Sequence, residues 1–487
     1  MSAARVVVLG AGPAGLAAAT HLLEHGRGRV SVRLLNMGHH LGGKAASYVD
    51  ARGRKSEHGW HMVLGFYARM RKLMRSAGVD VARTLSSMGG QSHAYESWDG
   101  RIHTLDGSGG RLSVAGKFLG YDGLPLAERL AFGRFMTQAY AIATSAEDAR
   151  RHDDICWDTW AIEHGLRPHI TRYSLFRLFR EAFFNFPEPI SAYHVLCTLR
   201  LMSTSEDAEA FVCRGPFSER IWDPIGRHIE RLGGKIEPYS MVTDFVYDGP
   251  RVRGLRVARP DPAGHDSGMS PWKTRQIPEA QGSARVDEQF DWVISTLPHA
   301  VLATLNARDQ RFWSSPYFRR ITHLRSASTI AMTVRTRRPV GRFQGPVFGL
   351  PAPLGICVDM TRHLDETRGS PGSFLSFVGQ EAGFEAWSDE QIVSFTLDNF
   401  ARAPGFGDVR AAGIAELEIH RNRADFERIF LCEPGVQQFR PGPLTPFRNL
   451  FLAGDWVTNE VDLVCMEGAI ASGLEAAKQV LGRVGQS

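Results

Sequence analysis

The chain has 487 residues, and none of its apolar runs is long enough to serve as a membrane-spanning helix. A helix that crosses a bilayer needs about 20 consecutive apolar residues, whereas the apolar segments here are short and interrupted by glycine or charge. The N-terminal apolar stretch also lacks the charged region and cleavage site of a signal peptide. We therefore expect a cytoplasmic protein. Whether it also binds the surface of a membrane is not decided by the sequence.

Cysteine is scarce, with six residues and no C-x-x-C pair, so reduced thiols are expected rather than disulfides or a zinc site. The charge is nearly balanced, because 57 basic and 52 acidic residues leave a net charge of +5. So small a surplus gives no reason to expect nucleic acid as a partner. The sequence contains no H-E-x-x-H, Ser/His/Asp or paired-carboxylate motif, and we predict no metal.

The N-terminus carries the strongest positive signal. Residues 5–9 form an apolar, β-branched run typical of a buried strand, and a helical Ala/Leu-rich segment follows at 16–24. Between them lies G-x-G-x-x-G at 10–15, the dinucleotide-binding fingerprint in its required context. Its glycines allow a tight turn, a close approach to pyrophosphate and close helix packing, while the helix N-terminus favours anions. The fingerprint by itself leaves NAD, NADP and FAD open.

A second strand is expected at residues 29–36 and ends at Asn36. In a Rossmann unit this position, about 20 residues after the glycines, carries an acid that binds the adenosine ribose. An asparagine can still accept one hydroxyl hydrogen bond, although it is uncharged. We therefore predict that Asn36 contacts the ribose and that Asn36→Glu keeps or tightens cofactor binding.

Two further segments precede the first basic helix. Gly42-Gly43-Lys44 offers paired glycines and a cation, which suit a second approach to phosphate, although an ordinary surface turn has the same composition. The stretch Glu57-His58-Gly59-Trp60-His61 places two histidines and a tryptophan close together. His58 and His61 are the candidates for taking up a proton or orienting a substrate, although a structural role is the commoner one for a histidine.

The order of these motifs resembles the FAD-dependent carotenoid (phytoene and zeta-carotene) desaturases of the flavin amine oxidase superfamily. The resemblance rests on G-x-G-x-x-G, L-G-G-K-A-A-S at 41–47 and E-H-G-x-H-x-x-x-G-x-Y at 57–67. It returns in N-L-F-L-A-G-D at 449–455 and M-E-G-A-x-x-S-G at 466–473. It implies that FAD is the cofactor and that both ends of the chain bind it.

The C-terminal motif has a physical interpretation that agrees with this resemblance. Residues 450–453 read as a short buried strand, after which Gly454 allows close approach and Asp455 can accept from a ribityl hydroxyl. A helix opens at Met466, and its N–H groups can stabilise negative charge on the flavin. Together, the motifs and the resemblance predict cofactor contacts at Gly10, Gly12, Pro13, Ala14, Gly15, Asn36, Gly42, Gly43, Lys44, Gly59, Trp60, His61, Val242 (backbone, against the adenine), Gly454, Asp455, Met466, Glu467 and Ala469.

The segment between Asp455 and Met466 is expected to run beside the flavin ring. Trp456, Glu460 and Asp462 are therefore candidate substrate contacts. Amine oxidases of the superfamily commonly place an aromatic residue just before M-E-G, and here Val461-Asp462-Leu463 stands instead. This departure argues against a typical amine oxidase.

The predicted fold is α/β, with a Rossmann-like FAD-binding domain of the three-layer ββα type and a discontinuous α+β substrate domain. Residues 1–85, 220–300 and 440–487 are assigned to the FAD-binding domain. Residues 86–219, mostly helical, and 301–439, a sheet layer over the flavin, are assigned to the substrate domain. Further strands are expected at 235–238, 241–246, 252–257, 291–298, 328–334 and 374–378, a helix at 389–400, and a polar surface excursion at 259–289.

One segment of the substrate half stands out, since residues 167–186 alternate aromatic and basic side chains at helical spacing. We favour a helix with an aromatic core-facing side over a lipophilic tunnel mouth or a membrane-surface helix.

The resulting functional prediction is an FAD-dependent oxidoreductase that desaturates a lipophilic polyene, isoprenoid or related secondary metabolite by hydride transfer to flavin N5. The sequence does not identify the electron acceptor, and oxygen, a quinone or another acceptor are the expected candidates. An oxidase of amine or amino-acid-derived substrates and a non-redox FAD-dependent isomerase are the alternatives.

Overall fold

The computed structural model describes residues 3–49, 55–57, 59–106, 120–205, 209–259, 285–307, 309–341, 345–403, 405 and 407–485. His58 and most of the predicted excursion at 259–289 lie outside these ranges. No helix within the described residues combines the length and apolarity needed to cross a bilayer.

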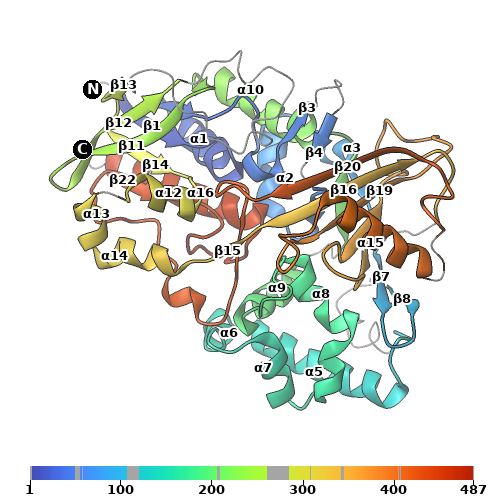
Figure 1. Ribbon diagram of the computed structural model, residues 1–487. Coiled ribbons are helices and arrows are strands. Elements are labelled where there is room, and N and C mark those ends of the chain that lie inside the picture. Colours follow the sequence, from blue (N-terminus) through green and yellow to red (C-terminus); the bar gives the residue numbers. More distant parts are fainter. Residues whose placement is uncertain are drawn as a thin grey trace.

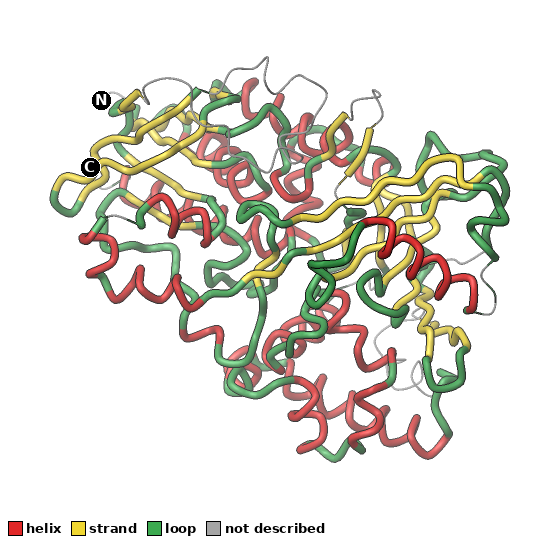
Figure 2. The backbone as a smooth tube through the Cα atoms, in the orientation of Figure 1, coloured by secondary structure: helices red, strands yellow, loops and turns green. Residues whose placement is uncertain are grey.

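The N-terminal strand lies in the middle of a five-stranded parallel sheet (Figures 1 and 2). β1 (Ala4–Leu9) pairs with β2 (Val30–Leu35) on one side and with β14 (Trp292–Ser295) on the other. β10 (Lys235–Glu237) and β22 (Leu450–Leu452) complete the order β10-β2-β1-β14-β22. Residues 6–9 are almost fully buried, as expected for a parallel strand covered on both faces.

Helices and a second sheet complete this half of the molecule. α1 (Pro13–Gly26) packs along α16 (Met466–Val484), and α10 (Asp223–Arg231) packs beside α1. A three-stranded antiparallel sheet contains β11 (Met241–Asp248), β12 (Arg251–Ala258) and β13 (Arg285–Asp287). The Asn449 side chain connects this sheet to β22, because it both accepts from and donates to the backbone of Val252 at 2.9 Å. The α/β prediction is confirmed.

A seven-stranded sheet forms the other large layer, with the order β20-β16-β19-β18-β17-β7-β8. Its long central strands are β16 (Thr329–Thr336), β19 (Phe374–Gln380) and β20 (Ile414–Asn422), and the strands predicted at 328–334 and 374–378 are thus confirmed. Even-numbered residues of β16 pack with α15 (Asp389–Arg402), whereas Thr333 and Arg335 face the opposite side. This alternation follows from the period of two along a strand.

The edge of this sheet contains a hairpin that the sequence pattern did not indicate. Residues 86–219 were expected to be mostly helical, but β7 (Gln91–Glu96) and β8 (Arg101–Asp106) form an antiparallel hairpin. The hairpin escapes a pattern search because β7 buries the polar residues His93 and Glu96. Glu96 accepts from the Tyr121 hydroxyl at 2.7 Å and from the Ser174 backbone at 3.0 Å, and so ties the hairpin to the helical part.

The helical part lies at the bottom of Figure 1 and contains α5 (Leu126–Ala143), α6 (Ala146–Arg150), α7 (Trp157–Glu163), α8 (Ser174–Ala182) and α9 (Ala192–Thr204). The aromatic and basic segment forms η3 (Pro168–Arg172) and α8. Phe176 is buried, while Arg177 pairs with Glu181 and Arg180 pairs with Asp158. Phe176 thus packs in the core, as the core-facing interpretation predicts, while Arg177 and Arg180 are paired and mostly buried where a solvated basic face was expected.

Shorter elements connect these layers. One of them crosses the predicted domain division, since β9 (Ala210–Cys213) pairs with β5 (Met62–Leu64) and β6 (Leu85–Ser87); the division itself stays a prediction. The others are η1 (Gly43–Ala45), β3 (Ser47–Val49), β4 (Lys55–Glu57), α2 (Ala68–Ser76), α3 (Val81–Thr84), η4 (Ser218–Trp222), α12 (His299–Leu305), α13 (Gln310–Ser314), α14 (Pro316–Arg319), η5 (Arg320–His323), β15 (Ser326–Ala327), β17 (Val347–Phe348), β18 (Ile356–Asp359), β21 (Ile429–Phe430) and η6 (Val436–Gln438).

Candidate active site

The first glycine turn is shaped by the absence of side chains. Gly10 has φ +100°, and a Cβ atom on Gly15 would lie 1.9 Å from the carbonyl oxygen of Gly10. α1 then begins at Pro13, with Gly12 at its N-cap and therefore no side chain to cap the first turn. The N–H groups of that turn point their partial positive charge toward the carboxyl edge of the sheet, which is the usual place for a phosphate.

The second glycine turn lies directly against the first. Gly42 has φ +111° and donates its N–H to the Ala11 carbonyl at 2.8 Å. A Cβ atom on Gly43 would lie 3.0 Å from the Gly12 Cα atom. The two turns predicted to approach phosphate therefore form one continuous cradle that any larger residue would fill.

The C-terminal motif is joined to the same cradle. The Gly454 N–H donates to the Ser472 hydroxyl at 3.0 Å, which fixes the turn after β22 to α16. A Cβ atom on Gly473 would lie 2.1 Å from the carbonyl oxygen of Ala14, so α16 can approach the start of α1 only because residue 473 is glycine. The final S-G of the motif thus holds the two ends of the chain together.

The sequence did not single out the carboxyl end of β14, which contributes to the same region. The Thr296 hydroxyl donates to the Leu9 carbonyl at 2.7 Å, beneath the first glycine turn. Burial and, to a smaller extent, the charge of Lys44 lower the pKa of His299 to about 4, while Asp455 acts in the opposite direction. Lys44 and Asp455 therefore lie near one imidazole. One sequence signal pointed to this region: residues 296–299 lie at the carboxyl end of a predicted buried strand, and α/β sheets bind ligands at the carboxyl ends of their strands.

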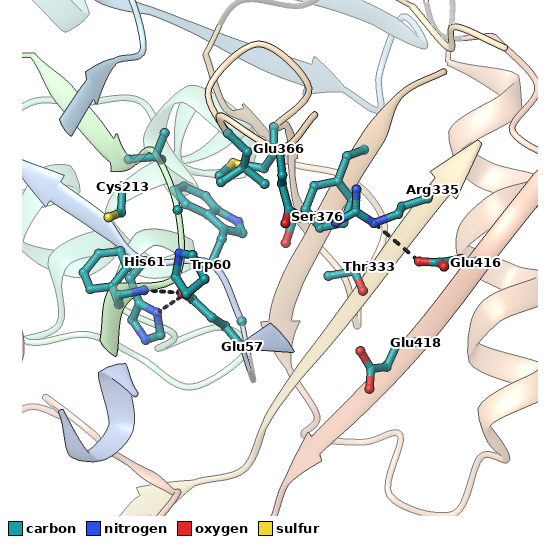
Figure 3. Close-up of a pocket in the computed structure, with 18 of the residues that line it drawn as sticks. Glu57, Trp60, His61, Cys213, Thr333, Arg335, Glu366, Ser376, Glu416 and Glu418 are labelled. Atoms are coloured by element: carbon teal, nitrogen blue, oxygen red, sulfur yellow. Dashed lines mark hydrogen bonds and ion pairs between the residues drawn. The ribbon is translucent and has the colours of Figure 1, made fainter. Parts of the chain in front are cut away.

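A cavity of about 550 Å³, called the main cavity below, lies between residues 57–61 and the seven-stranded sheet (Figure 3). On the sheet side, Arg335 of β16 is paired in register with Phe374 and Glu416, and Thr333 is paired with Ser376 and Glu418. Opposite them in Figure 3 stand Glu57, Trp60 and His61. The remaining wall is largely apolar and includes Val212, Phe217, Met360 and Leu364.

The charged groups of the main cavity have protein partners. Arg335 pairs with Glu366 and, at 3.4 Å, with Glu416, and its guanidinium lies 4.1 Å from the centre of the Phe374 ring. Glu57 accepts from the Phe217 backbone at 2.9 Å, and its other oxygen lies 3.4 Å from Nδ1 of His61. Glu57 therefore connects the imidazole to the backbone near β9 and sets its orientation.

Comparison with known proteins identifies this architecture. Residues 13–481 match the family described as flavin containing amine oxidoreductase. The chain belongs to this family. Its cofactor is accordingly FAD, and the protein is an FAD-dependent oxidoreductase.

Two curated relatives match this oxidoreductase over nearly their whole length. A protein named 15-cis-phytoene desaturase from Synechococcus elongatus is 25% identical, covering 98% of this chain and 96% of the relative. A protein named zeta-carotene desaturase from Synechocystis is also 25% identical, covering 98% and 97%.

Solved structures establish the fold of the whole chain. A putrescine oxidase variant has a TM-score of 0.70 at 16% identity, covering 99% of both chains. An oxidoreductase from Methanosarcina mazei has a TM-score of 0.67 at 16% identity, covering 97% of this chain and all of that one.

The described residues fit FAD at the cradle. Gly10–Gly15 and Gly42–Lys44 would hold the pyrophosphate, and Gly454-Asp455 would approach the ribityl side. The first turn of α16, which contains Met466 and Ala469, lies beside the same region through the Ser472 contact. Val242, at the start of β11, is paired with Val257 next to an irregularity in the register, and its contact with adenine stays a prediction.

Asn36 has a role that the sequence did not indicate. Its side-chain N–H₂ group donates to the carbonyls of Gly38 and His40 at 2.8 and 2.9 Å. The amide therefore holds the turn that leads to Gly42. A carboxylate cannot donate these bonds, so the expectation that Asn36→Glu keeps or tightens FAD binding changes to an expected loss.

Glu467 has protein partners at the start of α2, and its contact with the cofactor stays a prediction. Its carboxylate accepts the N–H groups of Arg69 and Met70 at 2.9 and 3.0 Å and pairs with the Arg69 guanidinium at 3.2 Å. Burial raises the pKa of this carboxyl, and these donors partly offset the rise. Glu467 thus caps the start of α2 and supports the site from behind.

The three predicted substrate contacts all have other partners. Trp456 is buried and donates its indole N–H to the Leu297 carbonyl at 3.1 Å, while Glu460 pairs with Arg69 at the surface. Asp462 is buried with φ +57°, pairs with Arg440 at 2.8 Å and accepts from the Tyr193 hydroxyl at 2.7 Å. None of the three lines the main cavity, so their substrate contacts stay predictions without structural support.

Proposed function

We propose that this protein desaturates a lipophilic polyene or isoprenoid bound in the main cavity. The observation that carries the proposal is the nearly full-length match to relatives named as phytoene and zeta-carotene desaturases. The apolar part of the cavity wall, with Trp60, Phe217 and Phe374 among its residues, suits such a substrate.

Bound FAD supplies the chemistry of the redox step, because it accepts a hydride at N5. The residues of the chain position the substrate and exclude water from the reacting bond. His61 is proposed to take up the proton that leaves the substrate, at Nε2, while Glu57 holds Nδ1. His58, the other predicted catalytic residue, lies outside the described residues.

The experiment is anaerobic mixing of the FAD-loaded protein with a polyene such as phytoene. Desaturation predicts stoichiometric loss of the visible absorbance of the flavin and formation of the desaturated product. Product that forms without reduced flavin and without any acceptor would instead identify an isomerase. Addition of oxygen or of a quinone to the reduced protein then shows which of the two restores the absorbance.

Replacement of His61 tests the proton transfer separately. We expect His61→Phe to lower the rate of flavin reduction by about 10²–10⁴-fold without changing the spectrum of bound FAD. His25→Phe is the matched control, since His25 is exposed on α1. An unchanged reduction rate in His61→Phe would remove His61 from the mechanism.

A second candidate function has one observation in its favour. Among the described residues, the lining of the main cavity contains the carboxylates of Glu57, Glu366, Glu416 and Glu418 and the guanidinium of Arg335. An excess of carboxylates suits a cationic amine. Reduction of the flavin by a primary amine such as putrescine, but not by the polyene, would favour an amine oxidase.

Membrane contact is proposed at the surface formed by Trp98, Leu126 and Leu130, whose exposures are 58%, 66% and 49%. These side chains belong to one region, because Trp98 contacts Tyr173, and Tyr173 contacts His169, which pairs with Glu128 of α5. Isolated exposed apolar residues are common, whereas a group of this kind favours an apolar or interfacial partner. Co-sedimentation with phosphatidylcholine vesicles, weakened by Leu126→Ser, is the test.

A further inference from the structure

A second cavity, of about 110 Å³, lies farther along the same face of the seven-stranded sheet and is called the second cavity below. Phe374 and Ser376 of β19 line the main cavity, whereas Gln380 of the same strand lines the second. Residues 374, 376, 378 and 380 share one face of the strand, so Ser376 and Gln380 are separated by about 13 Å at 3.3 Å per residue. An extended isoprenoid chain can span this distance.

Apolar side chains connect the two cavities. Val378, which lies between Ser376 and Gln380, packs in one cluster with Ile356, Trp60 and Phe184. Trp60 lines the main cavity, whereas Ile356 and Phe184 line the second. Phe184 has φ +54°, a conformation that bulky residues rarely adopt outside sites under functional constraint. These packed side chains separate the cavities, so a substrate chain that follows this route along β19 would have to pass between apolar groups and one constrained aromatic residue.

The far end of this route is polar. The Gln380 residue is 4% exposed, and neither polar atom of its carboxamide has a hydrogen-bond partner among the described residues. Glu181 also lines the second cavity, accepting from the Gly349 N–H at 2.8 Å and from Arg177 at 2.7 Å. A carboxylate has about four acceptor sites, so Glu181 can accept a further hydroxyl hydrogen bond.

We propose that the second cavity binds an oxygenated end of the substrate, a hydroxyl or carbonyl group, and that the Gln380 carboxamide is its hydrogen-bond partner. This inference rests on the proposed function, because it assumes a lipophilic substrate that enters through the main cavity. A buried amide left unpaired by a hydrocarbon is unfavourable, whereas an oxygen function satisfies it. The substrate is accordingly an isoprenoid or polyene that carries oxygen at one end.

The experiment compares two probes that differ by one oxygen atom. The FAD-loaded protein is immobilised, and retention of geranylgeraniol and of the same isoprenoid chain without the hydroxyl group is measured over a concentration series in detergent. We expect the wild-type protein to bind the alcohol about tenfold more tightly than the hydrocarbon. Gln380→Met, which keeps the length of the side chain, is expected to abolish this preference and to leave hydrocarbon binding within about twofold.

The control is Gln438→Met, the same change at an exposed position, which is expected to keep the tenfold preference. Thermal unfolding of each variant shows whether it is folded. Equal binding of both probes by the wild-type protein overturns the inference, assigns the second cavity to ordered water and leaves the proposed function intact. A preference that survives in Gln380→Met also overturns it. Failure of both probes to bind refutes the proposed substrate class and this inference with it.

Discussion

The buried Arg440 side chain offers the sharpest test of how residues 455–457, at the end of the N-L-F-L-A-G-D motif, are held in place. Its guanidinium donates to the carbonyls of Asp455, Trp456 and Val457 at 3.0–3.2 Å. It also pairs with Asp462 at 2.8 Å, and the two side chains are 0% and 4% exposed. One cation therefore satisfies three consecutive carbonyls and one buried carboxylate beside the cofactor.

Arg440→Met removes this cation while filling much of its volume. Removal of one partner from a buried ion pair costs about 3–5 kcal/mol, because Asp462 would stay buried with the Tyr193 hydroxyl as its remaining side-chain donor. The three carbonyls lose donors as well. Since whole domains are stable by only about 5–15 kcal/mol, we expect a large fall in the free energy of unfolding and weaker FAD binding, because Asp455 moves with the released segment.

Urea unfolding of the FAD-free protein and FAD titration measure the two effects separately. Arg410→Met is the matched control, because the Arg410–Asp398 pair is exposed, with 43% and 50% of the side chains accessible. Such a pair contributes about 0–1 kcal/mol. Arg440→Met/Asp462→Asn is expected to regain part of the loss, since the uncompensated charge is gone. A loss below about 1 kcal/mol in Arg440→Met, with unchanged FAD affinity, would refute this reasoning.

Three further predictions follow from contacts around the cradle. Asn36→Glu removes two hydrogen-bond donors from the turn between residues 36 and 42. We expect it to weaken FAD binding about tenfold, as measured by fluorescence titration. Equal or tighter binding would restore the interpretation that residue 36 contacts the ribose. Gly473→Ala is expected to lower the free energy of unfolding by about 1–3 kcal/mol, because its Cβ atom would clash with the Ala14 carbonyl. The loss is measured as a lower Tm. An unchanged Tm would show that α16 can shift to relieve the clash. Hydrogen bonds from Arg33 lower the pKa of Glu237 from its ordinary 4.5 to about 2. The ionised carboxylate therefore stabilises the fold above pH 4.5, and this contribution is lost as the pH falls toward 2. The free energy of unfolding of Glu237→Gln at pH 7 should therefore be lower than that of the wild type by about 3 kcal/mol. Its urea midpoint should also depend less on pH between pH 5 and 3 than that of the wild type. An equally steep dependence in the variant would show that another group causes the acid sensitivity.

The cofactor-binding half was largely predictable because its signals are local. β1 contains the apolar run Val6–Leu9 and β22 is Leu-Phe-Leu, and a glycine that is predicted to approach FAD follows each strand within two residues. The Asp248-Gly249 turn between β11 and β12 follows from composition for the same reason, and Gly249 has φ +52°. A parallel sheet buried on both faces leaves few alternatives for such segments.

The roles of individual polar residues were harder to predict, because their partners are distant in sequence. Glu467 accepts a hydrogen bond from Arg69, 398 residues earlier in the chain, and Asp462 binds a tyrosine 269 residues away. Both occupy positions where the family resemblance implies cofactor or substrate. The pattern identifies the segment that surrounds the cofactor, whereas the tertiary contacts decide which of its side chains face inward.

The main cavity was not predictable residue by residue for a related reason. Its sheet wall alternates polar and apolar side chains, and such alternation is typical of a solvent-exposed face as well as of a mixed binding surface. The tertiary structure distinguishes the two cases, because Glu57, Trp60 and His61 stand opposite this face and close the cavity.

The contact between Gly473 and Ala14 also has a consequence for folding on the ribosome. β1 and α1 are synthesised long before their neighbours β14, β22 and α16. Strand pairs with such a high sequence separation form slowly, and the apolar strands made first stay exposed until their partners are available. We therefore expect FAD to bind late in folding, and we expect a nascent chain truncated before α16 to depend on chaperones.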